Sequence, residues 1–175
     1  SSIDSLKFAM GDANPKVEEK LTKISSFTKE TIVELRDTIW AMNKEAITVE
    51  DLEARISNFI DNAKTSLTGT NFEFKSNFDN ENLHSFSSKD GMNMYRIIQE
   101  AVNNAIKHAE ASRIQVEINC LKDKIEFQIL DNGKGMDEEQ NSFGNGLVSM
   151  KKRAQELQTK LLIQKLEKGT SISFQ

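Results

Sequence analysis

Apolar residues recur at intervals of three and four along much of the first two thirds of the chain, and this spacing predicts helices. It runs over 3–10, 16–43, 52–63 and 94–109. Between the first two segments, a turn places Pro15 at the start of the second helix, where its missing N–H costs little. The 16–43 segment keeps its apolar seam for several turns, which is typical of a helix that pairs with another helix.

Strict alternation of apolar and polar residues predicts strands in the second half of the chain. Apolar residues alternate over 114–118 and over 125–129, on either side of Leu121–Lys124. Two alternating runs joined by a short polar turn indicate a hairpin. Phe72 and Phe74 predict an earlier strand, which a polar loop follows as far as about Ser87.

The remaining pattern predicts a helix over 147–157 and a second strand pair from 161–166 and 171–174. Helices and an antiparallel-leaning sheet then separate into two layers, so the expected fold class is an α+β two-layer sandwich. The helical seam ends near residue 46. We therefore expect two domains, a helical segment at 1–46 and a globular domain at 47–175.

Composition excludes several classes of protein. Hydrophobic residues make up 37% and charged residues 29%, so the chain can bury a core. The net charge is −4 without a block of Lys and Arg, which argues against a nucleic-acid-binding surface. No stretch approaches the roughly 18 apolar residues of a membrane span, and we expect no secretory signal. Cys120 is the only cysteine, so an internal disulfide is excluded and a reducing compartment is favoured.

Polar residues on the 94–109 helix are candidates for metal and phosphate chemistry. Glu100 and Asn104 are four residues apart and share one face, while Asn103 and Lys107 share a neighbouring stripe. Carboxylate and carboxamide oxygens suit a hydrated Mg²⁺ ion that carries phosphate. The same residues also fit the solvent-exposed face of an ordinary helix. These residues alone leave that alternative open.

Glycines concentrate in three later segments. The segment 129–136 leaves a strand and enters Gly133 and Gly135, which permit close backbone approach, and Asp131 offers an acceptor for an exocyclic amine. The segment 144–147 opens a helix whose exposed amides favour an anion. The segment 168–171 precedes the last strand. Turn chemistry, a plain helix start and a hairpin turn are the alternatives for the three segments.

The order and spacing of these segments identify a protein family more specifically than any single segment does. The segments QEAVNNAIKHA, DNGKGM, GNGLVSM and GTSISF follow one another along the chain. Together they resemble the N box and the three glycine boxes of the histidine-kinase-type ATP-binding domain of the Bergerat superfamily. The resemblance covers about residues 47–175, and it implies a domain that binds ATP with Mg²⁺.

The resemblance assigns a role to residues at the purine end of the expected site. Asp131 would receive the adenine amino group, and Gly133 and Gly135 would let the loop pass the purine. Thr170 would support the adenine pocket through a hydrogen bond or a water molecule.

At the phosphate end, the resemblance implies that Asn104 ligates the Mg²⁺ that bridges the phosphates. Glu100 is the acid of the N box, either polarising an attacking water or organising a water or the metal. The other positions implied to bind nucleotide are Lys107 and His108 near the phosphates, and Gly144, Gly146 and Leu147 at the hinge of the nucleotide lid.

The N-terminal segment narrows the resemblance. The helix ending in LRDTIWAMN and the short interval between the first two glycine boxes are similar to sensor histidine kinases of the short-lid class, which includes nitrate and lipid-thermosensor kinases. Those kinases pair two helices per subunit in a dimeric four-helix bundle. The resemblance implies a homodimer through an N-terminal helical hairpin. From the pattern alone, a hairpin folded back on its own domain stays open.

In that class the first bundle helix carries the phosphoacceptor histidine. The two histidines here are His84, in a predicted loop, and His108, in the N box. We therefore expect that the chain starts downstream of the phosphoacceptor and cannot phosphorylate itself.

The implied function is transfer of the γ-phosphoryl group of Mg-ATP to a histidine of the dimerisation helix. The phosphoryl group would then pass to an aspartate on the receiver domain of a response regulator. The implied location is the bacterial cytoplasm. Whether the parent protein is also anchored in the inner membrane stays open. An ATP-hydrolysing conformational switch of the same superfamily and a non-catalytic docking module are the alternatives.

Overall fold

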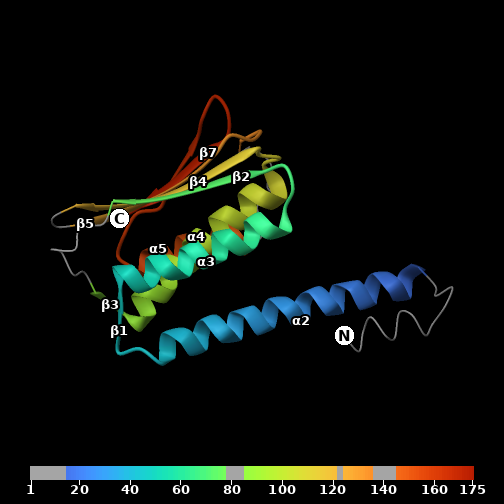
Figure 1. The fold of residues 1–175 in the computed structure, drawn as a ribbon, viewed down its shortest axis with the longest axis horizontal. Coiled ribbons are helices and arrows are strands. Elements are labelled where there is room, and N and C mark those ends of the chain that lie inside the picture. The colour runs from blue at the N-terminus through green and yellow to red at the C-terminus, as the bar shows by residue number, and fades with distance from the viewer. Residues whose placement is uncertain (1–14, 78–84, 122–123, 136–144) are drawn as a thin grey trace. The chain divides into compact units, whose positions relative to one another are not determined.

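The computed structural model describes residues 15–77, 85–121, 124–135 and 145–175 (Figure 1). The chain divides into two compact units, residues 1–43 and 44–175. In the described part of the first unit the chain forms helix α2 (Pro15–Met42), which confirms the helix expected over 16–43. The shorter helix expected over 3–10, and with it the helical hairpin, lies outside the described residues.

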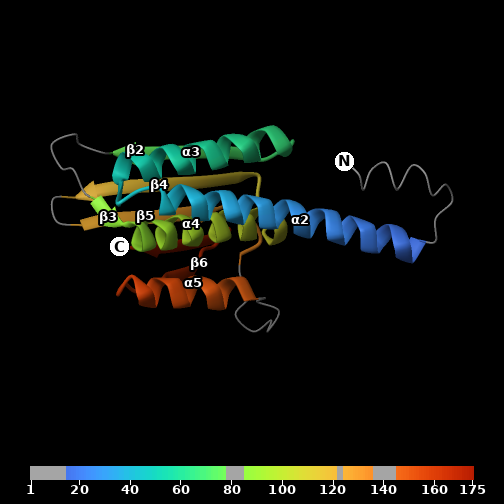
Figure 2. The same ribbon diagram turned by 90° about the horizontal axis from the view of Figure 1, so that it is seen from below.

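The second unit is an α+β fold with helices on one side of a mixed sheet (Figure 1). Its elements are β1 (Ala46–Thr48), α3 (Val49–Ser66), β2 (Asn71–Asn77), β3 (Ser85–Ser87), α4 (Ser88–His108), β4 (Arg113–Leu121), β5 (Lys124–Asp131), α5 (Asn145–Glu156), β6 (Leu162–Lys165) and β7 (Thr170–Phe174). The five-stranded sheet has the order β2-β4-β5-β7-β6. Figure 2 shows α4 between α3 and α5 beneath this sheet.

The sheet is mixed, and three of its four strand pairings are antiparallel, which agrees with the antiparallel-leaning sheet that the sequence predicts. β4, β5, β7 and β6 pair antiparallel, and Leu121 of β4 lies opposite Lys124 of β5, as the predicted hairpin requires. β2 pairs with β4 in parallel, from Asn71 opposite Arg113 onwards. The chain passes through α4 between these two strands, and a crossover helix of this kind returns the chain in the same direction.

The core lies between the sheet and the three helices. The inward residues of the hairpin, Ile114, Val116, Ile118, Ile125, Phe127 and Ile129, are all buried, as their alternation predicts. Phe127 stacks on Phe174 of the neighbouring strand, with ring centroids 4.8 Å apart. Between the helices, Tyr95 of α4 meets Phe59 of α3 edge to face at 6.3 Å.

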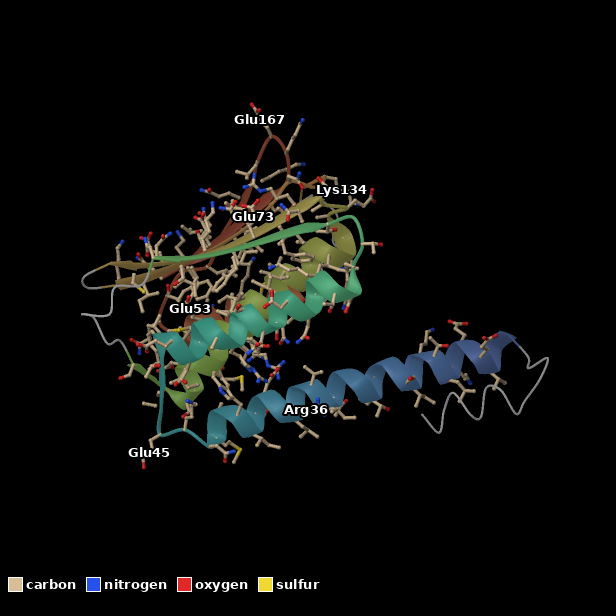
Figure 3. The ribbon with its side chains drawn as sticks, in the orientation of Figure 1. Arg36, Glu45, Glu53, Glu73, Lys134 and Glu167 are labelled. Carbon is tan, nitrogen blue, oxygen red and sulfur yellow. The ribbon has the colours of Figure 1, made fainter. Side chains whose placement is uncertain are left out.

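The face of the sheet away from the helices carries charged side chains that form ion pairs with one another. Arg113 donates a hydrogen bond to Glu73 over 2.7 Å, from β4 to β2, and Figure 3 shows Glu73 on this outer face. Lys124 lies 2.8 Å from Glu126 on β5. None of the helices in the described part of the chain combines the length and the hydropathy of a membrane-spanning segment.

Two local features explain where the helices begin. Thr48 and Asp51 form a capping box at the start of α3, as the sequence Thr48–Asp51 predicts. α4 begins at Ser88, six residues earlier than predicted, because Ser87 caps it by accepting a hydrogen bond from the Asp90 amide. Residues 85–87, expected to be loop, instead pair with β1 as the short strand β3.

Candidate functional site

Helix α4 separates an apolar face from a polar one. It buries a continuous face against the sheet and its neighbouring helices, made of Ile97, Ile98, Ala101, Val102 and Ala105. Glu100 and Asn104 stand one turn apart on another face, and both are half-buried. Their oxygen atoms are thus accessible from outside the core yet held on a rigid element.

The loop after β5 turns on the side chain of Asp131. The amide N–H of Gly133 donates to Asp131 Oδ1 over 2.9 Å, which forms a local turn of the kind that Asp favours. Asn132 fixes the other side of the turn, because its Oδ1 accepts from the Arg113 amide at 2.9 Å and its Nδ2 donates to Ser112 Oγ at 3.0 Å. Asp131 is half-buried at the end of the strand.

The same loop rests on the C-terminal end of α4. The amide of Lys134 donates to the Ala109 carbonyl over 2.9 Å, and a Cβ on Gly133 would overlap that carbonyl. Lys134 Nζ lies 2.9 Å from Glu110 Oε1, a hydrogen bond that lowers the pKa of Glu110 below its ordinary value. Figure 3 shows Lys134 at this end of the sheet. The 131–135 loop and the end of α4 therefore form one packed corner.

The start of β7 completes this corner. Gly169 has a φ of +91°, and a Cβ there would overlap the carbonyl oxygen of Asp131. Gly135 has a φ of +77°, and its own Cβ would lie 3.1 Å from the Gly169 carbonyl. Thr170, the next residue, is 2% exposed. Leu130 pairs with Ser171 in the antiparallel register, so Asp131, which follows Leu130, lies next to Thr170, which precedes Ser171.

The N-terminus of α5 meets α4 one turn before Asn104. A Cβ on Gly146 would overlap Oε1 of Glu100, so the backbone of α5 passes directly beside this carboxylate. Gly146 belongs to the first turn of α5, where backbone amides lack helical acceptors and favour anions. Leu147 follows it and is half-buried.

The structure brings most of the expected site residues into two groups, which helix α4 connects. Asp131, Gly133, Gly135 and Thr170 lie together at the sheet end, and Glu100 and Gly146 lie together at the helix end. Asn104 lies on α4 between Glu100 and the Ala109 carbonyl. Lys107 and His108 are exposed at the last turn of α4. Gly144 lies outside the described residues.

Two contributors were not predicted: the Ala109 carbonyl holds the 131–135 loop, and the Asn132 side chain ties that loop to β4. Gly169 belongs to a predicted glycine segment, and the structure adds that it lets β7 pass over Asp131. The sequence does carry one signal for Asn132, because Asn and Gly in succession after a strand mark a turn. Nothing in the sequence points to Ala109, because it acts through its backbone.

Solved structures share this fold. The histidine kinase AdeS of Acinetobacter baumannii superposes with a TM-score of 0.64 at 10% identity, over 98% of this chain and 89% of that one. The catalytic domain of the histidine kinase ThkA superposes with a TM-score of 0.59 at 15% identity, over 74% of this chain and 92% of that domain. The second unit therefore has the α+β ATPase fold of histidine kinase catalytic domains.

Sequence comparison gives the family. Residues 89–175 match the family described as histidine kinase-, DNA gyrase B-, and HSP90-like ATPase. DegS of Brevibacillus brevis, named a signal transduction histidine-protein kinase/phosphatase, is 30% identical over 156 residues, which are 88% of this chain and 39% of DegS. The sensor histidine kinase ComP of Bacillus subtilis is 37% identical over 79 residues, which are 43% of this chain and 10% of ComP.

Residues 89–175 belong to this ATPase family, and the chain is homologous to sensor histidine kinases of the DegS and ComP type. It spans about two fifths or less of the length of these relatives.

Proposed function

We propose that this chain is the catalytic, ATP-binding part of a two-component sensor histidine kinase. The observation that carries the proposal is that four segments far apart in the sequence contact one another in the second unit. Asp131, Gly169 and the end of α4 form a single corner, and Gly146 approaches Glu100 farther along the same helix. Helix α4 thus connects residues that match a purine, at its C-terminal end, with residues that match phosphates, at Glu100.

Asp131 is proposed to select adenine. The Gly133 amide donates to its Oδ1 and so orients the carboxylate, and Oδ2 would accept a hydrogen bond from the exocyclic amino group of the base. A carboxylate accepts a hydrogen bond from an amino group but repels the carbonyl oxygen of guanine at the same place. The buried Thr170, in the adjacent register position, would support the base directly or through water.

The phosphates are proposed to lie between Asn104 and the start of α5. Half-buried oxygen donors on a rigid helix, Asn104 and Glu100, fit the preference of Mg²⁺ for hard oxygen ligands and retained waters. Asn104 would hold the ion, which when bound supplies neutralising charge to the triphosphate. Gly146 would present backbone amides to the phosphates, with Lys107 and His108 near them.

In the proposed reaction, a histidine nitrogen attacks the γ-phosphorus, a P–N bond forms, the bond to the bridging oxygen breaks, and ADP leaves. This domain contributes positioning and charge stabilisation and forms no covalent bond with the phosphoryl group. Neither His84 nor His108 lies within α2, so the acceptor is proposed to belong to another segment of the parent protein. An aspartate on a response-regulator receiver domain would then take the phosphoryl group.

Helix α2 is proposed to pair with a second copy of the chain. Its exposed large apolar residues are Val17, Ile24, Phe27, Ile32, Val33, Leu35, Ile39 and Met42. An apolar stripe of this length is unfavourable in water. Burial in a dimeric helix bundle would remove it from solvent.

A phosphotransfer assay tests the proposed function. The chain is incubated with Mg-ATP labelled on the γ-phosphate and with the parent protein's helical segment that contains a histidine. We expect acid-labile, alkali-stable phosphate on that segment. Steady ATP hydrolysis with no phosphohistidine would instead support an ATP-driven conformational switch, and absence of nucleotide binding would support a docking module.

A further inference from the structure

A polar cluster ties the far end of α5 to α4. Asn93 is 5% exposed, although its amide is polar. Its Nδ2 donates to Glu156 Oε2 over 3.2 Å, and its Oδ1 accepts from Arg153 Nη1 over 3.3 Å. Lys89 Nζ lies 3.4 Å from the same Glu156 oxygen. One buried amide of α4 thus engages two charged residues of α5 at once.

The two helices run antiparallel, and their contacts are in register. Asn93 precedes Glu100 by seven residues, which is two helical turns, and Arg153 follows Gly146 by the same number. The pair Asn93 and Arg153 therefore lies two turns away from the pair Glu100 and Gly146. Met150, which is fully buried, occupies the α5 turn between them.

The two ends of this interface fix the position of α5 in different ways. At the Glu100 end, a Cβ on Gly146 would overlap the carboxylate in its present position, so a side chain there would displace Glu100. A slip of α5 by one residue would move its backbone about 1.5 Å along the axis and turn it by about 100°. That slip would bring a side chain to Glu100 and would break both hydrogen bonds of Asn93. An unpaired buried amide is costly, so the cluster opposes the slip.

We propose that Asn93 is a positioning residue for the phosphate end of the nucleotide site, acting by holding α5 in the register that sets Gly146 beside Glu100. Asn93 does not touch the nucleotide, because it lies two turns from the site. This inference rests on the proposed function, since it takes the start of α5 as the place that receives phosphates. It predicts that loss of the cluster weakens the binding of ligands that carry phosphates and leaves the affinity for ligands without phosphates unchanged.

The experiment compares ATP and adenosine. Binding of Mg-ATP and of adenosine is measured by calorimetry on the whole chain, for the wild type, Asn93→Leu and Glu156→Ala. Gln155→Ala is the matched control, because Gln155 is exposed on the same turn of α5. We expect Asn93→Leu to weaken Mg-ATP about tenfold or more, as for loss of hydrogen bonds to charged groups. Adenosine affinity should stay within about twofold, and the control should match the wild type.

Other outcomes separate the possible failures. Equal weakening of ATP and adenosine would show a general loss of structure and overturn the positioning role, and so would unchanged ATP affinity. If the wild type binds neither ligand, the proposed function fails, and Asn93 loses its role with it. If Asn93→Leu does not fold, Glu156→Ala decides, because Glu156 is exposed and its removal leaves the core intact.

A second measurement tests the register directly. Amide hydrogen exchange should rise at Gly146 and the following turn in Asn93→Leu, while the strands stay protected. The double variant of Asn93→Leu and Gly146→Ala should bind ATP more tightly than the product of the single effects predicts, because both changes act on the same helix position. If the effects of the two single substitutions on ATP affinity simply multiply in the double variant, the proposed coupling is contradicted.

Discussion

The substitution Asp131→Asn isolates the oxygen that is proposed to face adenine. Asn keeps Oδ1, so the hydrogen bond from the Gly133 amide, 2.9 Å in the wild type, can persist and hold the 131–135 loop. The second oxygen becomes an NH₂ group. The amino group of adenine then meets a donor where it met a charged acceptor, while shape and volume stay almost the same.

The expected loss of affinity follows from the loss of one hydrogen bond to a charged group. A hydrogen bond to a charged group contributes about 1.5–3 kcal/mol, which corresponds to a loss of affinity of about 10- to 150-fold. The new NH₂ group of the variant would also face the amino group of adenine, and the repulsion between these two donors weakens binding further. Calorimetry should show the loss for adenosine and for Mg-ATP alike, because the change lies at the base end, in contrast to substitutions at Asn93.

The control is a carboxylate of the same type far from the site. Asp61→Asn, on the exposed side of α3, should bind both ligands as the wild type does. The thermal midpoint of Asp131→Asn should stay close to that of the wild type, since the turn is retained. Unchanged adenosine affinity in a folded Asp131→Asn protein would refute the assignment of the adenine end.

Three further predictions concern the backbone, the assembly and the pH. Gly169→Ala should destabilise the fold by about 2 kcal/mol or more and weaken nucleotide binding, because a left-handed φ costs Ala about 1–2 kcal/mol and its Cβ overlaps the Asp131 carbonyl; chemical denaturation with unchanged stability would count against this. Leu35→Asp should shift sedimentation toward the monomer, since Leu35 is 57% exposed on α2; identical profiles would contradict the proposed dimer. The hydrogen bond from Lys44, 2.5 Å long, lowers the pKa of Asp51, so its stabilisation is present above the unfolded value of about 3.9 and is lost as the pH falls through the lower folded value. Asp51→Asn should therefore be less stable than the wild type at pH 7, with a gap in urea melts that closes in acid; a gap independent of pH would disprove the linkage.

Local patterns predicted the elements that are long and regular. The α2 helix, the β4–β5 hairpin and the capping box at Thr48 all depend on residues close in sequence, and each is confirmed. The short strand β3 was missed because three residues show no period. The parallel pairing of β2 was missed because pairing partners more than 40 residues apart leave no mark in either segment.

Prediction of the site was limited in a different way. The spacing of the boxes indicated which segments carry chemistry, and the structure places Asp131, Gly133 and Gly169 in one corner. The contacts that hold this corner use the backbone of Ala109, which no side-chain pattern encodes. The position of Asn93 was equally hidden, because the predicted helix began one residue after it and polar residues usually face water.

The glycines of the second unit differ in whether a second substitution could ever rescue their replacement. A side chain at Gly133 or Gly169 would meet main-chain oxygen, which every amino acid possesses, so no change of the neighbouring residue can make room. The obstacle at Gly146 is the end of the Glu100 side chain, which a shorter residue would withdraw. Suppressor screens for restored folding stability that begin from Gly146→Ala should thus recover changes at Glu100, whereas screens that begin from the other two glycines should yield only reversion.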